Sequence, residues 1–222
     1  MDGMHRPGAE VMKAEPGGRE LWLERRKLAE ALRSYIAEVV ACDAPDGAFA
    51  EAAEAFEGFA RAFADHPRRT PTWQGGVVDP AEMQEFGAVS GLSNPLAPPL
   101  KIRTSSEAAV TGVVSFPPSF EGPPGLVHGG YITAALEELI EVAQAAAGHP
   151  GARRTLFVRF RSPCPLNAEL HMEAQNDNIG QRKIVTKATM YAGDQVVAEA
   201  EGIGRTDRQG SIGSDGRPNT DV

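Results

Sequence analysis

One long helical segment, about Gly130–Ala147, stands alone among strand-like segments in the C-terminal half of the chain. Its neighbours are rich in residues of high strand propensity and are bounded by turn-forming residues. In order they read AAVTGVVSF, LFVRFRS, ELHMEAQ, KIVTKATMYAG and QVVAEAEGIGR. Short polar turns at Asn176–Gly180 and Ala192–Asp194 join the last three, as in antiparallel hairpins. A single helix against a run of antiparallel strands predicts an α+β layer arrangement.

Length and composition suit a cytoplasmic globular protein with one good core and an appendage, or two small domains. The 222 residues are 41% hydrophobic and 23% charged, and the formal net charge is −8. A broad nucleic-acid or anionic-membrane surface needs concentrated basic residues, so we expect neither partner. No apolar run approaches the ~20 residues that span a bilayer, and the N-terminus lacks the apolar core of a secretory signal. We predict that Cys42 and Cys164 are reduced structural thiols.

Two amphipathic runs precede the strand region, so we predict a helical hairpin over residues 19–66. Its second run places four phenylalanines on one stripe, at positions 49, 56, 59 and 63. We expect this stripe to be hairpin core, with a lid over a pocket or a contact with another subunit as the alternatives. The remaining divisions are a flexible N-terminus over 1–18, a linker over 67–90, the strand domain over 91–208 and a disordered tail over 209–222.

A glycine-rich loop leads into the central helix. Glycines at 122, 125, 129 and 130 surround His128, where the loop must turn into the helix. Consecutive glycines let the backbone approach a ligand closely. The first N–H groups of a helix lack intrahelical partners, and the helix dipole favours negative charge there. This segment is therefore a candidate site for an anion, or for the oxygen of a polarised carbonyl.

Three glutamates of the central helix are candidates for acid–base chemistry. At ~100° per residue the apolar stripe comprises Ile132, Ala135, Leu136, Leu139, Ala143 and Ala146. Glu137 lies on one flank of this stripe, Glu138 on the other, and Glu141 points furthest away. Periodicity alone does not choose between Glu137 and Glu138, and solvated surface charges are the ordinary fate of such residues.

The segment VHGGYITAALEE, preceded by FEGPPG, resembles the His-Gly-Gly signature of hot-dog fold acyl-CoA thioesterases of the phenylacetic-acid-degradation type. The resemblance covers about Gly91–Arg205. It includes SNPLAPPL before the first strand, RTLFVRFRSPCPL after the helix, and NDNIGQRKIVTKATMYAGDQVVAEAEGIGR as the closing strands. It implies a hot-dog fold, an antiparallel sheet wrapped around one long central helix, preceded here by a helical N-terminal segment. The family's catalytic carboxylate stands nine residues after the histidine, which singles out Glu137.

The resemblance also implies roles for the other residues. The Gly129 amide would polarise the thioester carbonyl. Glu137 would be partly buried against the sheet and would act as general base or nucleophile. His128 would mainly shape the loop. Several family members carry an asparagine where this chain has Gly122. Some carry a serine or threonine early in the next strand; here Arg153 aligns best, and Thr155 is the possible substitute. No metal or cofactor is implied, since coenzyme A is part of the substrate.

Substrate contacts and partners complete the set of expectations. Gly122 and Gly130 would let substrate approach the backbone, and the CoA phosphates would need cations, for which Arg159, Arg161, Arg182 and Lys183 are candidates. The family builds its sites between subunits, so the resemblance implies a homodimer or a dimer of dimers. Two alternatives stay open: a non-catalytic acyl-CoA sensor on the same fold, and a hot-dog dehydratase or hydratase.

Overall fold

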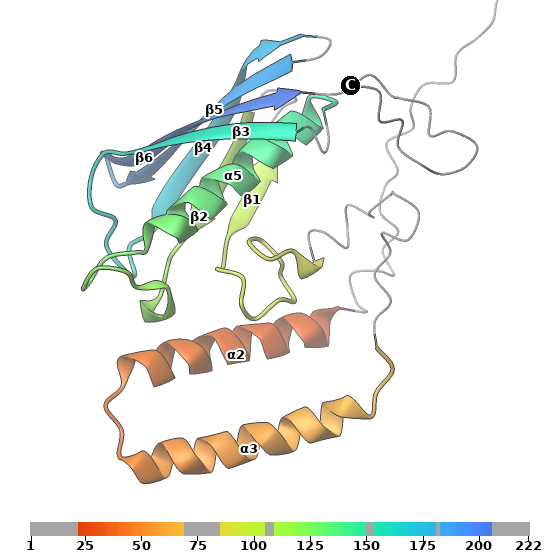
Figure 1. Ribbon diagram of the computed structural model, residues 1–222, viewed down its shortest axis with the longest axis vertical. Helices are drawn as coiled ribbons and strands as arrows, with labels where there is room; N and C mark the ends of the chain where they lie inside the picture. The colour runs from red at the N-terminus through yellow and green to blue at the C-terminus, as the bar shows by residue number, and fades with distance from the viewer. Residues whose placement is uncertain (1–21, 69–84, 105–108, 150–152, 181–182, 206–222) are drawn as a thin grey trace, which may run out of the picture.

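A six-stranded antiparallel sheet with one helix across its inner face forms the main body of the protein, seen here in a computed structural model (Figure 1). The structure describes residues 22–68, 85–104, 109–149, 153–180 and 183–205. In the order β1-β2-β4-β5-β6-β3, the strands are β1 (Lys101–Thr104), β2 (Ala109–Val114), β4 (Leu170–Ile179), β5 (Lys183–Ala192), β6 (Gln195–Arg205) and β3 (Arg153–Phe160). The helix is α5 (Gly129–Ala146). The predicted α+β arrangement is confirmed.

The core lies between α5 and the inner face of the sheet. The helix buries Ile132, Ala135, Leu136, Leu139, Ile140, Ala143 and Gln144. Five of the six residues of the predicted stripe are among them, but Ala146 is exposed, so the prediction was wrong at that position. Ile140 and Gln144, which lie on the flank of Glu137, are buried instead. The buried face therefore extends further toward this flank than the apolar pattern indicated, because a polar glutamine is part of it.

Strand β3 is one free edge of the sheet, and β1 is the other. Each residue of β3 pairs with β6 from Arg153 opposite Arg205 to Phe160 opposite Ala198. The side chains alternate between faces, as they do in any strand. Val158 and Phe160 are on the inner, helix-bearing face, since their partners Ala200 and Ala198 are buried there. Thr155, Phe157 and Arg159 occupy the outer face.

Two N-terminal helices lie beside the main body, as Figure 1 shows in orange. Helix α2 (Leu23–Ala41) packs against the short 3-10 turn η1 (Pro118–Phe120), and Ala29 is its buried residue. Helix α3 (Asp46–Ala64) lies on the far side of α2 and has no buried residue. The predicted helical N-terminal segment is confirmed.

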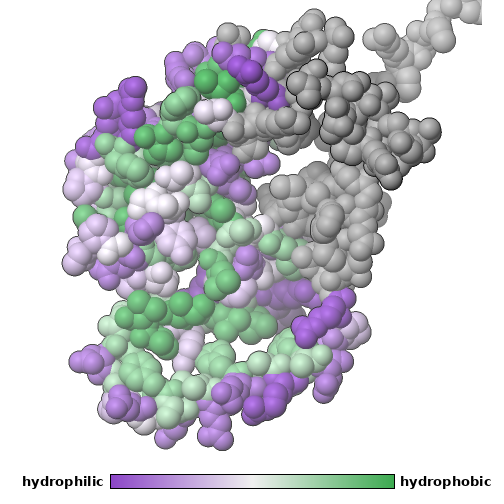
Figure 2. Space-filling model, viewed as in Figure 1, coloured by the Kyte–Doolittle hydropathy of each residue, from purple (hydrophilic) through white to green (hydrophobic). Residues whose placement is uncertain are grey.

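The expectation that the phenylalanine stripe of α3 is hairpin core holds for Phe56 but was wrong for Phe59 and Phe63. Phe56 contacts Tyr35 of α2, with ring centroids 4.6 Å apart. Phe59 and Phe63, however, are 61% and 60% exposed. The space-filling view shows apolar surface over this part of the molecule (Figure 2). A period of 3.6 identifies which face of a helix is apolar, but it does not say what covers that face.

A buried carboxylate joins α2 to the segment that precedes β1. Glu85 accepts hydrogen bonds from Arg26 of α2 at 2.9 and 2.5 Å, and from the hydroxyl of Ser93. The contact raises the pKa of Arg26, mainly through the hydrogen bond to Glu85. Nearby, Arg33 of α2 donates to the Asn94 carbonyl at 2.9 Å. These polar contacts fix α2 against the main body, because a buried carboxylate needs its partners in place.

Replacing Arg26 with Met should test this attachment, since methionine keeps part of the apolar stem and removes the charge. The Glu85 side chain is 2% exposed and that of Arg26 32%, so the pair is only partly buried. We expect the free energy of unfolding in urea to fall by about 2 kcal/mol, below the range for fully buried pairs. Lys27→Met is the control, because Lys27 pairs with Glu24 at the surface of the same helix, where such pairs contribute less than about 1 kcal/mol. Equal losses in both variants would contradict the assignment.

Candidate active site

The loop before α5 is held by backbone hydrogen bonds. Gly122 N–H donates to the Leu126 carbonyl, Val127 N–H to Cys164, and His128 N–H to Phe120, each at 2.9 Å. Gly125 has a φ of 75°, a conformation that glycine adopts readily. Its N–H donates to the Glu121 carboxylate at 2.6 Å. The loop therefore presents His128 and the start of α5 in a defined geometry.

Three glycines of the loop lie close to other groups of the chain, and the approach is closest at Gly122. A Cβ on Gly122 would lie 2.8 Å from the Cα of His128, and one on Gly130 would lie 3.0 Å from His128 Nδ1. A Cβ on Gly129 would lie 3.1 Å from the ring of Phe160. Packing around His128 thus accounts for Gly122 and Gly130, which we expected to contact substrate; that role stays a prediction.

The backbone amides at the start of α5 differ in what they bind. His128 is the N-cap, and its Nδ1 accepts a hydrogen bond from Gly130 N–H at 3.0 Å. Tyr131 N–H donates to the His128 carbonyl, also at 3.0 Å. Within the described parts of the chain, no acceptor is found for Gly129 N–H. An unsatisfied donor at the positive end of a helix can bind an anion or a developing oxyanion.

Glu137 and Glu138 face different parts of the molecule. Glu138 is half-buried, and its carboxylate accepts a hydrogen bond from Ser90, in the segment before β1. Glu137 lies about 20° around the helix axis from Gln144. Gln144 donates to the Gly202 carbonyl of β6 at 3.3 Å, so this flank faces β6 and the free edge of β3. The structure therefore separates two residues that periodicity left equivalent.

Glu137 is exposed in the single chain. The prediction that it is partly buried against the sheet was therefore wrong for the single chain. The sheet covers the flank at Gln144, which is 1% exposed, but leaves it open two turns earlier at Glu137. This opening lies on the side of the edge strand β3, whose outer edge is free. A carboxylate here is accessible to water and to a ligand that lies along the edge of the sheet.

Aromatic rings flank the start of α5, and one of them was missed in the sequence. Phe160, at the end of β3, places its ring against Gly129 and is 55% exposed. Tyr131 is 40% exposed and stacks edge-on against Phe120, with centroids 4.7 Å apart. The alternation of side chains along β3 could have placed Phe160 on the face of the sheet that bears α5. The sequence does not show that this strand ends beside Gly129.

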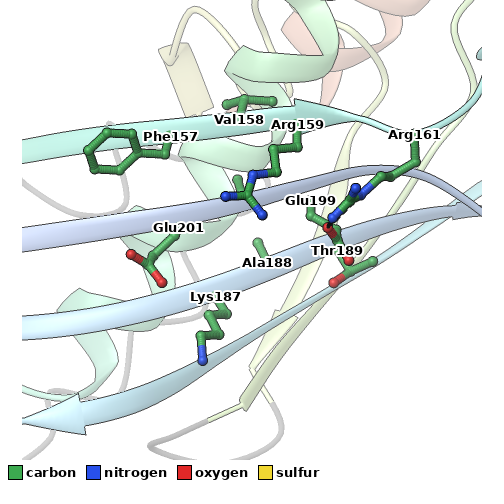
Figure 3. A pocket seen from close by; sticks show the side chains of 10 residues that line it. Phe157, Val158, Arg159, Arg161, Lys187, Ala188, Thr189, Glu199 and Glu201 are labelled. Carbon is green, nitrogen blue, oxygen red and sulfur yellow. Dashed lines mark hydrogen bonds and ion pairs between the residues drawn. The ribbon is translucent and has the colours of Figure 1, made fainter.

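The structure places Thr155, Arg159 and Arg161 away from the helix start within one chain. Thr155 and Arg159 are on the outer face of the sheet, opposite α5. Arg161 follows β3 and binds Glu199 of β6, with its Nη2 2.5 Å from the carboxylate. Figure 3 shows Arg159 and Arg161 beside an open pocket on this outer face, together with Phe157, Lys187 and Glu201. No contact between these residues and Gly129 or Glu137 follows from a single chain.

The other predicted cations are also remote from the helix start. Lys183 is exposed and begins β5, where its carbonyl accepts from Gly180 N–H at 2.8 Å. The Gly180 carbonyl in turn contacts His149, just past the C-terminal end of α5. The 18 residues of α5 rise by about 27 Å, so Lys183, near the C-terminal end of this helix, lies far from Gly129 in the same chain. Arg182 lies outside the described residues. Binding of CoA phosphates by these side chains stays a prediction.

A cysteine thiol also lies near the site. Cys164 is buried beside the loop, and burial raises the pKa of its thiol to about 11. A thiol in that state is a poor nucleophile at neutral pH.

Over the described ranges, no group of three His, Cys, Asp or Glu residues is arranged to hold a metal ion. Within those ranges there is also no helix with the length and apolarity needed to cross a membrane.

Comparisons with known proteins match the part of the chain that includes the His128 loop and α5 to thioesterases. The family model of the thioesterase superfamily matches residues 124–199, and these residues are about a third of the chain. A segment of 85 residues is 29% identical to human acyl-coenzyme A thioesterase THEM5. It covers 37% of this chain and 34% of that protein, so the chain spans about a third of the length of this curated relative.

Two solved structures are among those similar to this chain. A crystal structure described as a thioesterase superfamily protein aligns with a TM-score of 0.71 and 26% identity, over 81% of this chain and 94% of its own. A hypothetical thioesterase from Streptococcus pneumoniae, crystallised with coenzyme A, aligns with a TM-score of 0.46 and 15% identity, over 49% and 90%.

The first alignment includes more than the sheet and its helix. Residues 85–205 are little more than half of the chain, so coverage of 81% requires part of the N-terminal segment as well. The protein therefore has a hot-dog fold preceded by N-terminal helices, and residues 124–199, from the glycine-rich loop to β6, carry the match to the thioesterase superfamily.

Proposed function

We propose that this protein is an acyl-CoA thioesterase of the phenylacetic-acid-degradation type, which hydrolyses an acyl-CoA to a free acid and CoA. Two features of the same helix carry the proposal. The Gly129 N–H at its start has no acceptor in the described residues, and Glu137 is exposed on the flank that faces the free edge of the sheet. The similarity to a human acyl-CoA thioesterase supports the substrate class. The protein would act in the cytoplasm and would need no cofactor.

Hydrolysis of a thioester needs a donor to the carbonyl oxygen and a base or nucleophile at the carbonyl carbon. Gly129 N–H would bind the oxygen, where negative charge grows as the tetrahedral intermediate forms. Glu137 would remove a proton from the attacking water, or would attack the carbon itself to give a mixed anhydride that water then hydrolyses. The CoA thiolate leaves and takes up a proton from solvent. His128 would hold the loop, because its Nδ1 is already used by Gly130 N–H.

Gly129 and Glu137 would come from different subunits of a homodimer. Within one helix, eight residues separate them by about 12 Å along the axis and about 80° around it. Groups that share a carbonyl stand about 3 Å from its atoms. Strand β3 is a free edge that can pair with β3 of a second copy. Antiparallel pairing would turn the second α5 end for end, so that the helix start of one chain approaches Glu137 of the partner subunit.

Glu137→Gln keeps the size of the side chain and removes the base. We expect kcat for acyl-CoA hydrolysis to fall by ~100-fold or more, with the thermal unfolding temperature unchanged. CoA release can be followed with a thiol reagent over a panel of short, aromatic and long acyl-CoAs. Glu138→Gln is the matched control, because it changes the adjacent residue that Ser90 binds. Loss of activity only in the control, or saturable binding without turnover in the wild type, would overturn the proposal.

Gly129→Pro tests the amide itself, since proline removes the N–H and is tolerated at the first position of a helix. Gly129→Ala introduces the same Cβ beside Phe160 but keeps the N–H. We expect ~100-fold lower kcat in the proline variant than in the alanine variant. Similar activities in both would exclude the amide as the oxyanion donor.

Mixing the two inactive proteins tests whether the site is shared. After co-expression of Gly129→Pro with Glu137→Gln, half of the dimers are mixed and each contains one intact pair of groups. Activity should therefore return to about a quarter of the wild-type value. If each chain held a complete site, co-expression would restore nothing.

A further inference from the structure

Phe160 combines an inward-facing position with an exposed ring. Its partner across the ladder, Ala198, is fully buried, so the residue belongs to the face that bears α5. Further back on the same face, Leu156 and Val158 are partly buried against the core. The Phe160 ring is nevertheless 55% exposed. The inner face thus continues past the covered core as an apolar surface that the single chain leaves open.

That ring lies beside Gly129, the residue whose amide is assigned to the carbonyl. The three atoms that a Cβ on Gly129 would meet first all belong to Phe160, at 3.1, 3.4 and 3.8 Å. The N–H of Gly129 is bonded to the same Cα. A ligand oxygen bound to this N–H would therefore hold its carbonyl carbon, and the first carbons of the attached chain, within reach of the ring.

We propose that Phe160 is the specificity-determining contact for the acyl group and selects apolar acyl chains, aliphatic or aromatic, over acetyl. This inference rests on the proposed thioesterase function. A phenylalanine ring offers apolar surface and no hydrogen-bonding group, so it favours alkyl and aryl carbons over the polar pantetheine arm. An acetyl group leaves most of the ring in water, whereas a longer chain covers it. The gain grows with the area covered.

Phe157 provides a matched control on the same strand. It is 57% exposed, almost the same as Phe160, but lies on the outer face of the sheet, away from α5. Removing either ring therefore deletes a similar amount of exposed apolar surface from β3. The two substitutions differ in which face of the sheet loses it.

The experiment measures kcat/KM for acetyl-CoA, octanoyl-CoA and phenylacetyl-CoA with the full chain and with Phe160→Ala and Phe157→Ala. In Phe160→Ala we expect the ratio of either larger substrate to acetyl-CoA to fall by about 10-fold or more. In Phe157→Ala the ratios should stay within about twofold of wild type. A wild type without preference for the larger acyl groups, or equal changes in both variants, would overturn the inference.

Two further measurements keep the outcomes distinct. If none of the three substrates is hydrolysed by wild type, the proposed function itself fails. If wild type is active but the ratios of Phe160→Ala are unchanged, only the role of Phe160 fails. The oligomeric mass of each variant is measured in parallel. Should Phe160→Ala alter that mass, Phe160→Leu decides. Leucine keeps an apolar side chain for any contact between subunits but offers the acyl group less surface than the phenyl ring. The ratios of kcat/KM for the larger substrates to that for acetyl-CoA must then fall by at least about threefold.

Discussion

The depth at which α5 lies against the sheet depends on two glycines of the inner face. A Cβ on Gly202 of β6 would lie 2.6 Å from Ile140, and one on Gly112 of β2 would lie 2.9 Å from Met172 and 3.1 Å from Leu139. Side chains at these positions would push the helix away from the strands. Close packing of this kind decides where the ends of α5 emerge, and therefore where the His128 loop meets Phe160 of β3.

Buried polar contacts fix the rotation of the same helix about its axis. Gln144 donates to Thr186 at 3.1 Å, and Asn176 donates to the Ala143 carbonyl at 3.0 Å. Buried amides need their partners, so a rotated helix would lose these hydrogen bonds. With the rotation fixed, Glu138 meets Ser90 and Glu137 faces the free edge of β3. A polar network near the C-terminal end of α5 thus determines which of the two carboxylates in the middle of the helix faces β3.

The sequence was sufficient for the fold and for part of the candidate site. Strand propensity, turns and one helical stripe led to the α+β arrangement, whereas the choice of Glu137 over Glu138 came from the resemblance to the thioesterase family and stays a prediction. Contacts between distant segments, such as Ser90 with Glu138 or Phe160 with Gly129, leave no mark in local periodicity. The exposure of the α3 stripe depends on what surrounds that helix, which no pattern within it reveals.

Gly122 explains how this chain departs from the family pattern it resembles. Several members of that family carry an asparagine at this position. In this protein the Cα of His128 lies 2.8 Å from where the Cβ of any such residue would be, so a side chain would displace the N-cap. The loop is therefore built around close contact with His128, and no side-chain donor is available at this position. In the proposed mechanism, polarisation of the carbonyl would then rest on the backbone amide of Gly129, whose position is set by the fit of His128 and Phe160 around it.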